Sequence, residues 1–281
     1  MAEKSDTGWT RRAKDLDPAD LRADQPHSAR MYDYFLGGED NFPADREAAE
    51  KVIAAFPNVR ITARENRAFM ARAVRYLAAE AGIHQFIDLG TGIPTSPNLH
   101  EVAQRAAPDA RVVYADNDPI VLAHARALLA SGAAGRTAYL NADVRELDTI
   151  LTAAELHDTL NLSRPVAVSL LAVMHVIPDD QDAYGLVRRI VDALPAGSYL
   201  TLTHETADFD PVGSRGVRSA NVGGDIPAQA RCRAEVERFF AGLELVEPGV
   251  QVVHRWRPDS EVEDGLTDAD VALYGAVGRK D

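Results

Sequence analysis

Short apolar runs of strand length alternate with segments of helical period over the chain beyond residue 83. Strands are predicted near 85–89, 111–116, 136–141, 165–171, 197–204, 243–253 and 270–278, with helices near 97–107, 119–130, 146–158, 179–193 and 227–241. This alternation is typical of a parallel sheet with helices on both faces. No helix separates the last two strands, so one should run antiparallel. The expected fold is α/β, a doubly wound, seven-stranded, mostly parallel sheet with one antiparallel strand.

The chain before residue 83 has a different pattern and divides into two parts. Residues 1–25 are polar and are expected to form a flexible tail. Residues 26–82 carry apolar positions at helical spacing and should form a helical extension in front of the sheet domain, 83–281. Three helices are expected in this extension, beginning at Ser28, Pro43 and Thr62 and ending at Gly37-Gly38, Pro57 and Gly82.

Composition narrows the function classes. The formal charge of −13 disfavours nucleic acid as a partner, because backbone phosphates require a basic face. The single cysteine, Cys232, excludes an internal disulfide and a cysteine-cluster metal site, and the histidines show no metal-ligand spacing. No signal core and no apolar run of about 18 residues is present, so we expect a cytoplasmic protein without a membrane partner.

Three aspartates follow strand-length apolar runs at similar spacing. Asp88, Asp116 and Asp143 are separated by 28 and 27 residues, the length of one strand-helix-strand step. The carboxyl ends of parallel strands form the ligand crevice of an open sheet. Acceptor groups gathered there suit a ligand with a ribose diol and an amino-bearing base better than a diphosphate.

Each of these aspartates has a structural alternative. The Asp116 carboxylate could accept both ribose hydroxyls or cap the next helix. Asp118, directly before a proline, is favoured as a helix cap. Asp143 could accept from an exocyclic amine, while the Val144 N–H donates to a ring nitrogen, or it too could be a cap.

A glycine turn precedes the first expected crossover helix. Gly90 and Gly92 alone are weak evidence, because a tight turn without a ligand would also use them. A dinucleotide-binding turn needs a third glycine, where this chain has Pro94. Ser96 is expected to cap the following helix, with Pro97 at its first position.

Several long motifs together resemble a known family. Asp-x-Gly-x-Gly at 88–92, Tyr-x-Asp-x-Asp-Pro at 114–119, Ala-Asp-Val at 142–144 and Met-His-x-x-x-Asp at 174–179 resemble class I S-adenosylmethionine-dependent methyltransferases. More narrowly, segments 28–46, 64–67, 85–95, 113–119, Gly249, 256–258 and 275–280 resemble an actinobacterial methyltransferase family first catalogued as a domain of unknown function. The resemblance covers nearly everything after residue 26. It implies a Rossmann-like fold and S-adenosyl-L-methionine as cofactor, whose positive sulfonium suits an acidic rim.

The same resemblance implies positions for the cofactor. It puts Asp88, Gly90 and Gly92 around the methionine part and Asp116 at the ribose. Asn117 should lie beside the adenine, with Asp143 and Val144 at its edge, and Leu171 and Ala172 beneath the sulfonium.

Two histidines are candidates for a general base, should the methyl acceptor need to lose a proton. His175 follows the fourth expected strand and His204 ends the fifth, both on the ligand side of the sheet. Histidine is suited to accept a proton near neutral pH. A hydrogen-bonded structural histidine is the alternative for each.

The extension is expected to act as a lid over the cofactor and to shape the substrate pocket. The residues that carry this expectation are Tyr32, Tyr34, Gly37, Gly38, Asn41 and Arg67. A purely structural extension is the alternative, and Arg67 could bind a carboxylate or pair with an acidic residue.

Three functions are compatible with these observations. The first is a methyltransferase acting on a small molecule at O, N or C. The second is an aminopropyl-type transferase on the same fold, and the third is a non-catalytic S-adenosylmethionine-binding protein. The sequence identifies neither the acceptor nor the oligomeric state.

Overall fold

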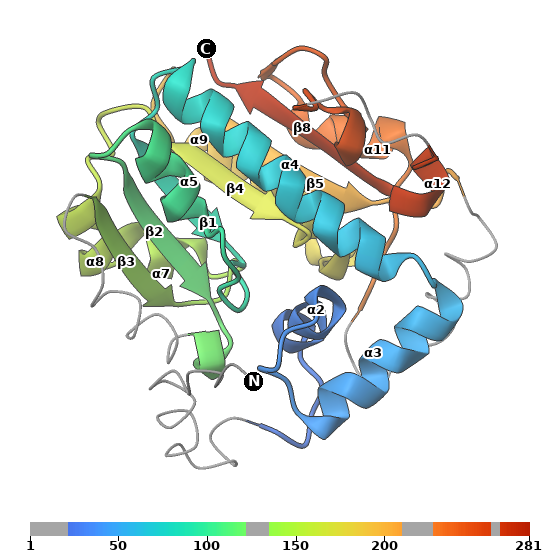
Figure 1. Ribbon diagram of the computed structural model, residues 1–281. Coiled ribbons are helices and arrows are strands. Elements are labelled where there is room, and N and C mark those ends of the chain that lie inside the picture. Colours follow the sequence, from blue (N-terminus) through green and yellow to red (C-terminus); the bar gives the residue numbers. More distant parts are fainter. Residues whose placement is uncertain (1–21, 122–134, 210–226, 260–264) are drawn as a thin grey trace, which may run out of the picture.

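The protein is described by a computed structural model at residues 22–121, 135–209, 227–259 and 265–281 (Figure 1). Its described strands form one eight-stranded sheet in the order β3-β2-β1-β4-β5-β8-β6, with β7 also paired to β8. The strands are β1 (Gln85–Leu89), β2 (Arg111–Asp116), β3 (Arg136–Asn141), β4 (Ala167–Leu171), β5 (Tyr199–Glu205), β6 (Glu244–Leu245), β7 (Gln251–Val252) and β8 (Leu273–Arg279).

The sheet confirms the expected mostly parallel architecture. Strands β1 to β5 are parallel to their neighbours, and β8 runs antiparallel to β5. The single strand expected at 243–253 is instead two short strands, β6 and β7, each paired with β8. A turn separates β6 from β7, because Pro248 has no N–H to donate to a neighbouring strand and Gly249 adopts a left-handed conformation with φ +77°.

The strand order places a crevice between β1 and β4. Chain order runs outward from β1 to β2 and β3 on one side, and from β4 to β5 on the other. Ligands of open α/β sheets bind at such a reversal, outside the carboxyl ends of the strands. Asp88 lies on β1, and Asp116 pairs in register with Asn141 at the ends of β2 and β3. The predicted acidic ends therefore share one edge of the sheet.

Helices cover both faces of the sheet (Figure 1). Helices α4 and α5 lie on one face, α7, α8, α9 and α11 lie on the other, and α2 and α3 stand below the carboxyl ends of the strands. The helices are α2 (Ser28–Leu36), α3 (Pro43–Ala55), α4 (Val59–Ala79), α5 (Leu99–Ala106), α7 (Leu147–Thr152), α8 (Ala154–Thr159), α9 (Ala183–Asp192), α11 (Arg233–Glu237) and α12 (Asp268–Val271), with 3₁₀ turns at Met174–Val176, Asp179–Gln181, Arg238–Phe240 and Val253–Arg255. Among the described residues, none of these helices is long and apolar enough to cross a membrane.

Two helices of the extension start differently from the sequence expectation. The cap of α2 is His27, whose side chain accepts from the Ala29 N–H, so Ser28 is its first helical residue. Helix α4 begins at Val59, ahead of the expected cap Thr62. The Thr62 hydroxyl instead donates to the Val271 carbonyl at 2.8 Å, a tertiary contact that local sequence does not reveal.

Helix α5 also begins with a different cap residue from the one expected. Its N-cap residue is Asn98, whose backbone N–H donates to Glu101 at 2.6 Å, and Ser96 lies in the preceding loop. The helix expected at 146–158 is broken at Ala153 into α7 and α8. Most of the helix expected at 119–130, and most of the tail at 1–25, lie outside the described residues.

Helix α4 belongs to the main core rather than to a separate lid. Phe69, Ala73 and Leu77 are fully buried and belong to the main hydrophobic core, together with residues of the sheet. Gly275 on β8 permits this approach, since a Cβ there would lie 3.1 Å from the Phe69 ring. The expected lid is therefore limited to α2 and α3. Most of their buried apolar residues form a separate small cluster with Ala63, while Ala29 packs with Ile93, Ile120 and Val121.

Candidate functional site

The turn after β1 uses both predicted glycines. Gly90 has φ +70° and Gly92 φ +67°, the left-handed conformation that glycine adopts without steric cost. A Cβ on Gly90 would lie 2.5 Å from a Val173 methyl group, so the backbone after β1 approaches the segment after β4 closely. At Gly92 a Cβ would meet open space, so its requirement is conformational.

Asp88 is a buried carboxylate beside this turn. It accepts a hydrogen bond from the Thr91 hydroxyl at 2.6 Å. Burial raises the pKa of Asp88 to about 6, although Thr91 and the charge of Arg67 act in the opposite direction. Arg67 itself donates to the Thr95 and Pro97 carbonyls, so it pins the loop after the turn.

Asp116 holds two loops together. One carboxylate oxygen accepts from the Gly92 N–H at 2.7 Å and the other from the Asp118 N–H at 2.9 Å. The side chain is buried, and burial raises its pKa despite these bonds. Each oxygen keeps a further lone pair, so the carboxylate can both fix the turn and accept from a ligand.

Asn117 and Asp143, from the loops after β2 and β3, contact each other. The Asn117 amide donates to Asp143 at 2.9 Å. Asp143 also accepts from the side chain of Arg145 at 2.8 and 2.6 Å, and this hydrogen bonding and charge lower the pKa of Asp143. The arginine was not predicted, because a residue two positions away carries no signal for such a pair. The adjacent Val144 is half-buried.

Free space at the glycine turn is small. A cavity of about 10 Å³ is lined by residues of the turn and by Arg67, Asp88, Tyr114 and Tyr139. Across the crevice, β4 ends at Leu171, and Ala172 follows with φ +56°.

The two histidines lie together but differ in their bonding. Their ring centroids are 6.1 Å apart. His204 is fully buried: its Nδ1 lies 2.7 Å from the Glu205 carbonyl and its Nε2 2.6 Å from an Arg231 nitrogen. The carbonyl requires a proton on Nδ1, so Nε2 accepts from the arginine. Both nitrogens are committed, which fits the structural alternative.

His175 is less constrained. Its Nδ1 is buried and makes no hydrogen bond to the described residues. Burial, reinforced by the charge of Arg231, lowers the pKa of His175 to about 4, and burial lowers that of His204 to about 3. Both rings are therefore neutral at pH 7.

Arg231 organises this side of the crevice and was missed by sequence reasoning. Its side chain is fully buried and donates to the Met174 and Ile177 carbonyls at 3.0 and 3.1 Å. It also binds Asp179 at 2.6 Å, which lowers the pKa of that carboxyl. An isolated arginine in a polar stretch carries no signal for burial, because its partners come from two segments distant in sequence, residues 174–179 and His204 on β5.

Residues of the extension fall into two groups. Tyr32 donates to the Ala63 carbonyl at 3.1 Å and accepts from Asn66 at 2.9 Å, facing α4. Tyr34 binds Glu50 at 2.5 Å and stacks with Arg60 on the outer side of α2. Tyr34 therefore does not face the crevice, contrary to the expected pocket wall.

Gly37, Gly38 and Asn41 form an internal turn of the extension. Gly37 ends α2 with φ +83°. A Cβ on Gly38 would overlap the Asp33 carboxylate, which also accepts from the buried Asn41 amide at 2.8 Å. These residues lie together, as their sequence positions suggested, but the contacts described for them are within the turn and with Asp33.

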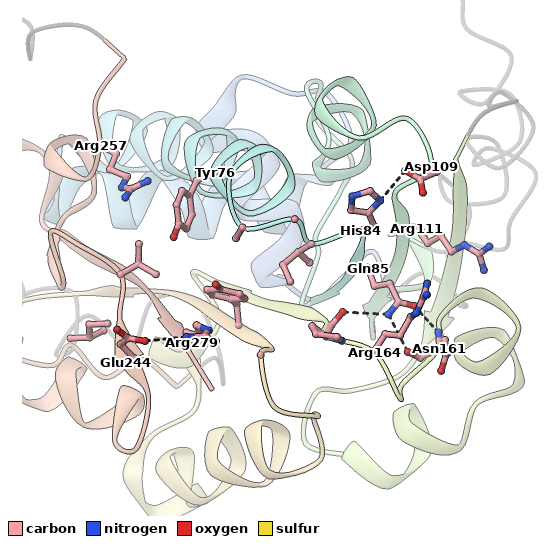
Figure 2. A pocket seen from close by; sticks show the side chains of 18 of the residues that line it. Tyr76, His84, Gln85, Asp109, Arg111, Asn161, Arg164, Glu244, Arg257 and Arg279 are labelled. Carbon is pink, nitrogen blue, oxygen red and sulfur yellow. Dashed lines mark hydrogen bonds and ion pairs between the residues drawn. The ribbon is translucent and has the colours of Figure 1, made fainter. Parts of the chain in front are cut away.

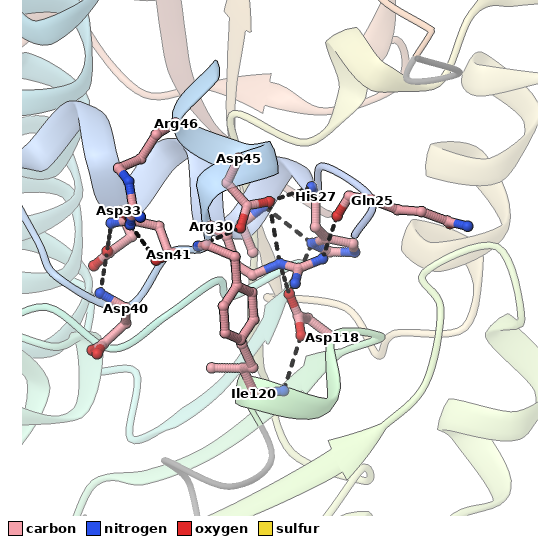
Figure 3. A network of polar contacts seen from close by, with 12 residues as sticks. Gln25, His27, Arg30, Asp33, Asp40, Asn41, Asp45, Arg46, Asp118 and Ile120 are labelled. Carbon is pink, nitrogen blue, oxygen red and sulfur yellow. Dashed lines mark hydrogen bonds and ion pairs between the residues drawn. The ribbon is translucent and has the colours of Figure 1, made fainter. Parts of the chain in front are cut away.

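A buried ion cluster joins the extension to the loop after β2 (Figure 3). Arg30 lies 3.4 Å from Asp45 and 3.3 Å from Asp118, and all three side chains are almost completely buried. His27 lies 3.0 Å from Asp118. Burial lowers the pKa of His27, but the hydrogen bond and charge of Asp118 more than offset this and raise it. We call these four residues the Arg30 cluster.

Asp118 is also the helix cap that the sequence predicted. One carboxylate oxygen accepts from the Ile120 N–H at 2.9 Å, and the other faces Arg30 and His27. The extension is thus attached one residue from Asn117 and two residues from Asp116.

A larger cleft of about 1110 Å³ lies at the opposite edge of the sheet (Figure 2). It is bounded by the amino ends of the strands, including Gln85 and Tyr199. Its charged groups are largely paired, His84 with Asp109 and Arg279 with Glu244. Cleft size alone does not identify the site, because the strand-end carboxylates and the strand-order reversal lie at the other edge. Within the described residues, no group of three or more acidic, histidine or cysteine side chains could hold a metal ion.

Comparison with known proteins places this geometry in context. Residues 14–281 match a family model described as S-adenosyl methyltransferase. The crystal structure of a DUF574 family protein from Streptomyces avermitilis is similar, with 51% identity and a TM-score of 0.89 over 93% of this chain and 100% of that one. A protein from Thermobifida fusca shares 42% identity and a TM-score of 0.85 over 94% of this chain and 98% of that one. No curated protein matches.

Because Asp118 is both a helix cap and a member of the Arg30 cluster, its removal should lower the free energy of unfolding by more than the loss of an ordinary cap. Asp118→Ala should lower the free energy of unfolding by about 3–5 kcal/mol, because it leaves a buried arginine short of a counter-charge. Thr267→Ala is a matched control that removes only the cap of α12, at about 1 kcal/mol. Urea denaturation measures both. Equal losses would mean that the cluster contributes no more than an ordinary cap.

Proposed function

We propose that this chain, which belongs to the S-adenosyl methyltransferase family, transfers the methyl group of S-adenosylmethionine to a small molecule. The observation that carries the proposal is the convergence of Asp88, Asp116 and Asp143 on one strand-end crevice beside a glycine turn. The acceptor class within small molecules is open, and the net charge of −13 disfavours nucleic acid.

The residues of the crevice fit this cofactor. Asp88 and Asp116 are buried, and burial raises the pKa of both, so their charges are under-compensated. Such groups favour a ligand that brings hydroxyl or ammonium donors and a positive charge. A diphosphate would instead place anions against them.

Each cofactor part has candidate partners. When bound, S-adenosylmethionine supplies a methyl group on a positively charged sulfur. We assign Asp88, Gly90 and Gly92 to the methionine part, Asp116 to the ribose, Asn117, Asp143 and Val144 to the adenine, and Leu171 and Ala172 to the region of the sulfur. Asp143 would orient the amide of Asn117 rather than act alone, because Arg145 already occupies part of its acceptor capacity.

His175 is the better candidate for proton transfer. It is neutral at pH 7, and its Nδ1 makes no hydrogen bond to the described residues. A neutral imidazole can accept a proton from an acceptor hydroxyl or amine as the new bond forms. His204 would act only as support, because both its nitrogens are engaged.

A non-catalytic cofactor-binding protein is a second candidate. The saturated bonding of His204 and the low pKa of His175 make both histidines weak candidates for a general base. Methyl transfer can proceed without one when alignment supplies most of the rate. Formation of S-adenosylhomocysteine in the presence of cell metabolites separates the two candidates, since only the enzyme produces it.

Cofactor identity can be tested by thermal stability. S-adenosylmethionine and S-adenosylhomocysteine should raise the melting temperature, with about 2.7 kcal/mol of stabilisation at a hundredfold excess over the dissociation constant. NAD and NADP should give no shift, because their phosphates would meet the acidic crevice. Equal shifts with NAD would contradict the proposed cofactor.

Truncation tests the lid. Deleting residues 1–25 should preserve cofactor affinity, because this polar stretch carries none of the residues assigned to the cofactor. Within its described part, residues 22–25, the Gln25 carbonyl accepts a hydrogen bond from Arg30. Deleting residues 1–57 removes Arg30, Asp45 and Tyr32 and should weaken binding at least tenfold while the sheet domain stays folded. Calorimetric titration and circular dichroism measure these outcomes. A longer truncation that binds as tightly as the full chain would exclude a lid over the cofactor.

Affinity should depend on the ionisation of Asp88. The pKa of this carboxyl is raised to about 6, so it is mostly ionised at pH 7 and mostly protonated at pH 5. A ligand that needs the carboxylate should bind about tenfold more weakly at pH 5. Asp88→Asn should bind weakly at both pH values with a flat profile. If the affinity of this variant still falls between pH 7 and pH 5 as in the wild type, the pH dependence belongs to another group, such as Asp116.

A further inference from the structure

The backbone just after β4 has an uncommon conformation. Ala172 has φ +56°, in the left-handed region that non-glycine residues rarely adopt. Such a residue persists only where its surroundings hold it, and these positions gather at functional sites. Ala172 lies at the strand-order reversal, facing the glycine turn across the crevice.

One hydrogen bond sets the direction of this peptide. The Ala172 N–H donates to the Thr203 hydroxyl oxygen on β5 at 2.8 Å. In a trans peptide the preceding carbonyl points the opposite way, so the Leu171 carbonyl points away from β5. Because β4 lies between β5 and β1, this oxygen is directed toward the crevice.

Thr203 is held in turn by a chain of hydrogen bonds that reaches the extension. Its hydroxyl donates to Asn66 Oδ1 at 2.9 Å, and Asn66 Nδ2 donates to the Tyr32 hydroxyl at 2.9 Å. Tyr32 donates to the Ala63 carbonyl at 3.1 Å. Thr203 has one proton and gives it to Asn66, so it must accept from Ala172. We call these contacts the Tyr32–Ala172 chain.

We propose that Thr203 and Asn66 are positioning residues that aim the Leu171 carbonyl at the positively charged sulfur of the cofactor. The inference rests on the proposed function. A carbonyl oxygen is a negative pole, and its attraction for a cation is stronger in a buried site than in water. S-adenosylhomocysteine has an uncharged sulfur and gains nothing from it. The chain therefore determines the preference for the charged methyl donor over the spent product.

The Tyr32–Ala172 chain also explains how the extension can influence that preference. Three side chains form the Tyr32–Ala172 chain. Asn66 lies on α4 and Thr203 on β5, whereas Tyr32 lies on α2. Movement of α2 would remove the acceptor of the Asn66 amide and loosen Thr203. The extension then acts on the methyl-donor end of the site through defined bonds, in addition to covering it.

The test compares the affinities of S-adenosylmethionine and S-adenosylhomocysteine by calorimetric titration. Thr203→Val removes the hydroxyl with little change of shape and should weaken S-adenosylmethionine about tenfold, but S-adenosylhomocysteine less than about threefold, as expected for one misdirected polar contact. Thr203→Ser keeps the hydroxyl and should restore the wild-type ratio of the two affinities.

Thr201→Val is the matched control. Thr201 lies on the same face of β5, is equally buried, and its hydroxyl makes no hydrogen bond to the described residues. Its replacement should leave both affinities unchanged. A changed ratio in this control would show that any loss of a buried hydroxyl has the effect, which would overturn the proposal.

The outcomes separate the two proposals. A wild-type protein that binds neither ligand overturns the proposed function and this inference with it. A wild type that binds both, with Thr203→Val weakening them equally, overturns only the inference. If Thr203→Val does not fold, Tyr32→Phe decides: a loss of about threefold for S-adenosylmethionine alone supports the chain, and an unchanged ratio refutes it.

Discussion

The Asp116 carboxylate is the contact on which the crevice depends. It accepts one backbone N–H from the turn after β1 and one from the loop after β2, and so fixes the relative position of two strand ends. A buried carboxylate that lost these donors would be costly, so the two loops must keep their arrangement whenever it is ionised. The loop that it holds also carries Asp118, to which the extension is tied.

The carboxylates near the crevice divide into two electrostatic kinds. Asp118, Asp143 and Asp179 each have a cationic partner within 3.3 Å, and the pKa of each is lowered. Asp88 and Asp116 make hydrogen bonds but no such ion pair with the residues that the structure describes, and burial raises their pKa. The first kind holds segments of the protein together. Carboxylates of the second kind would be stabilised by a positive charge or by further hydrogen-bond donors, which is the property expected of groups that bind a ligand.

The extension is connected to the sheet domain by polar contacts as well as by packing. The Arg30 cluster attaches it to the loop after β2, and the Tyr32–Ala172 chain attaches it to the end of β4. These two attachments flank the crevice between β1 and β4. Buried polar contacts of this kind are directional, so they specify where the extension sits more sharply than its small apolar cluster could.

In the described part of the chain, the sequence by itself determined the mostly parallel sheet, the alternation of its strands with helical segments and the line of aspartates at or just beyond the strand ends, because these follow from hydrophobic period and from spacing along one chain. It also grouped Gly37, Gly38 and Asn41, whose partners are close in sequence. Only the tertiary structure decided that Tyr34 points outward, that both nitrogens of His204 are used by Arg231 and a carbonyl, and that Asp118 is both a cap and an ion-pair partner. The physical reason is that the partners of a buried polar side chain come from segments distant in sequence, such as Thr203 and Asn66, which are 137 residues apart. Local patterns set which residues are available at an edge of the sheet, and long-range packing sets which of their atoms remain free for a ligand.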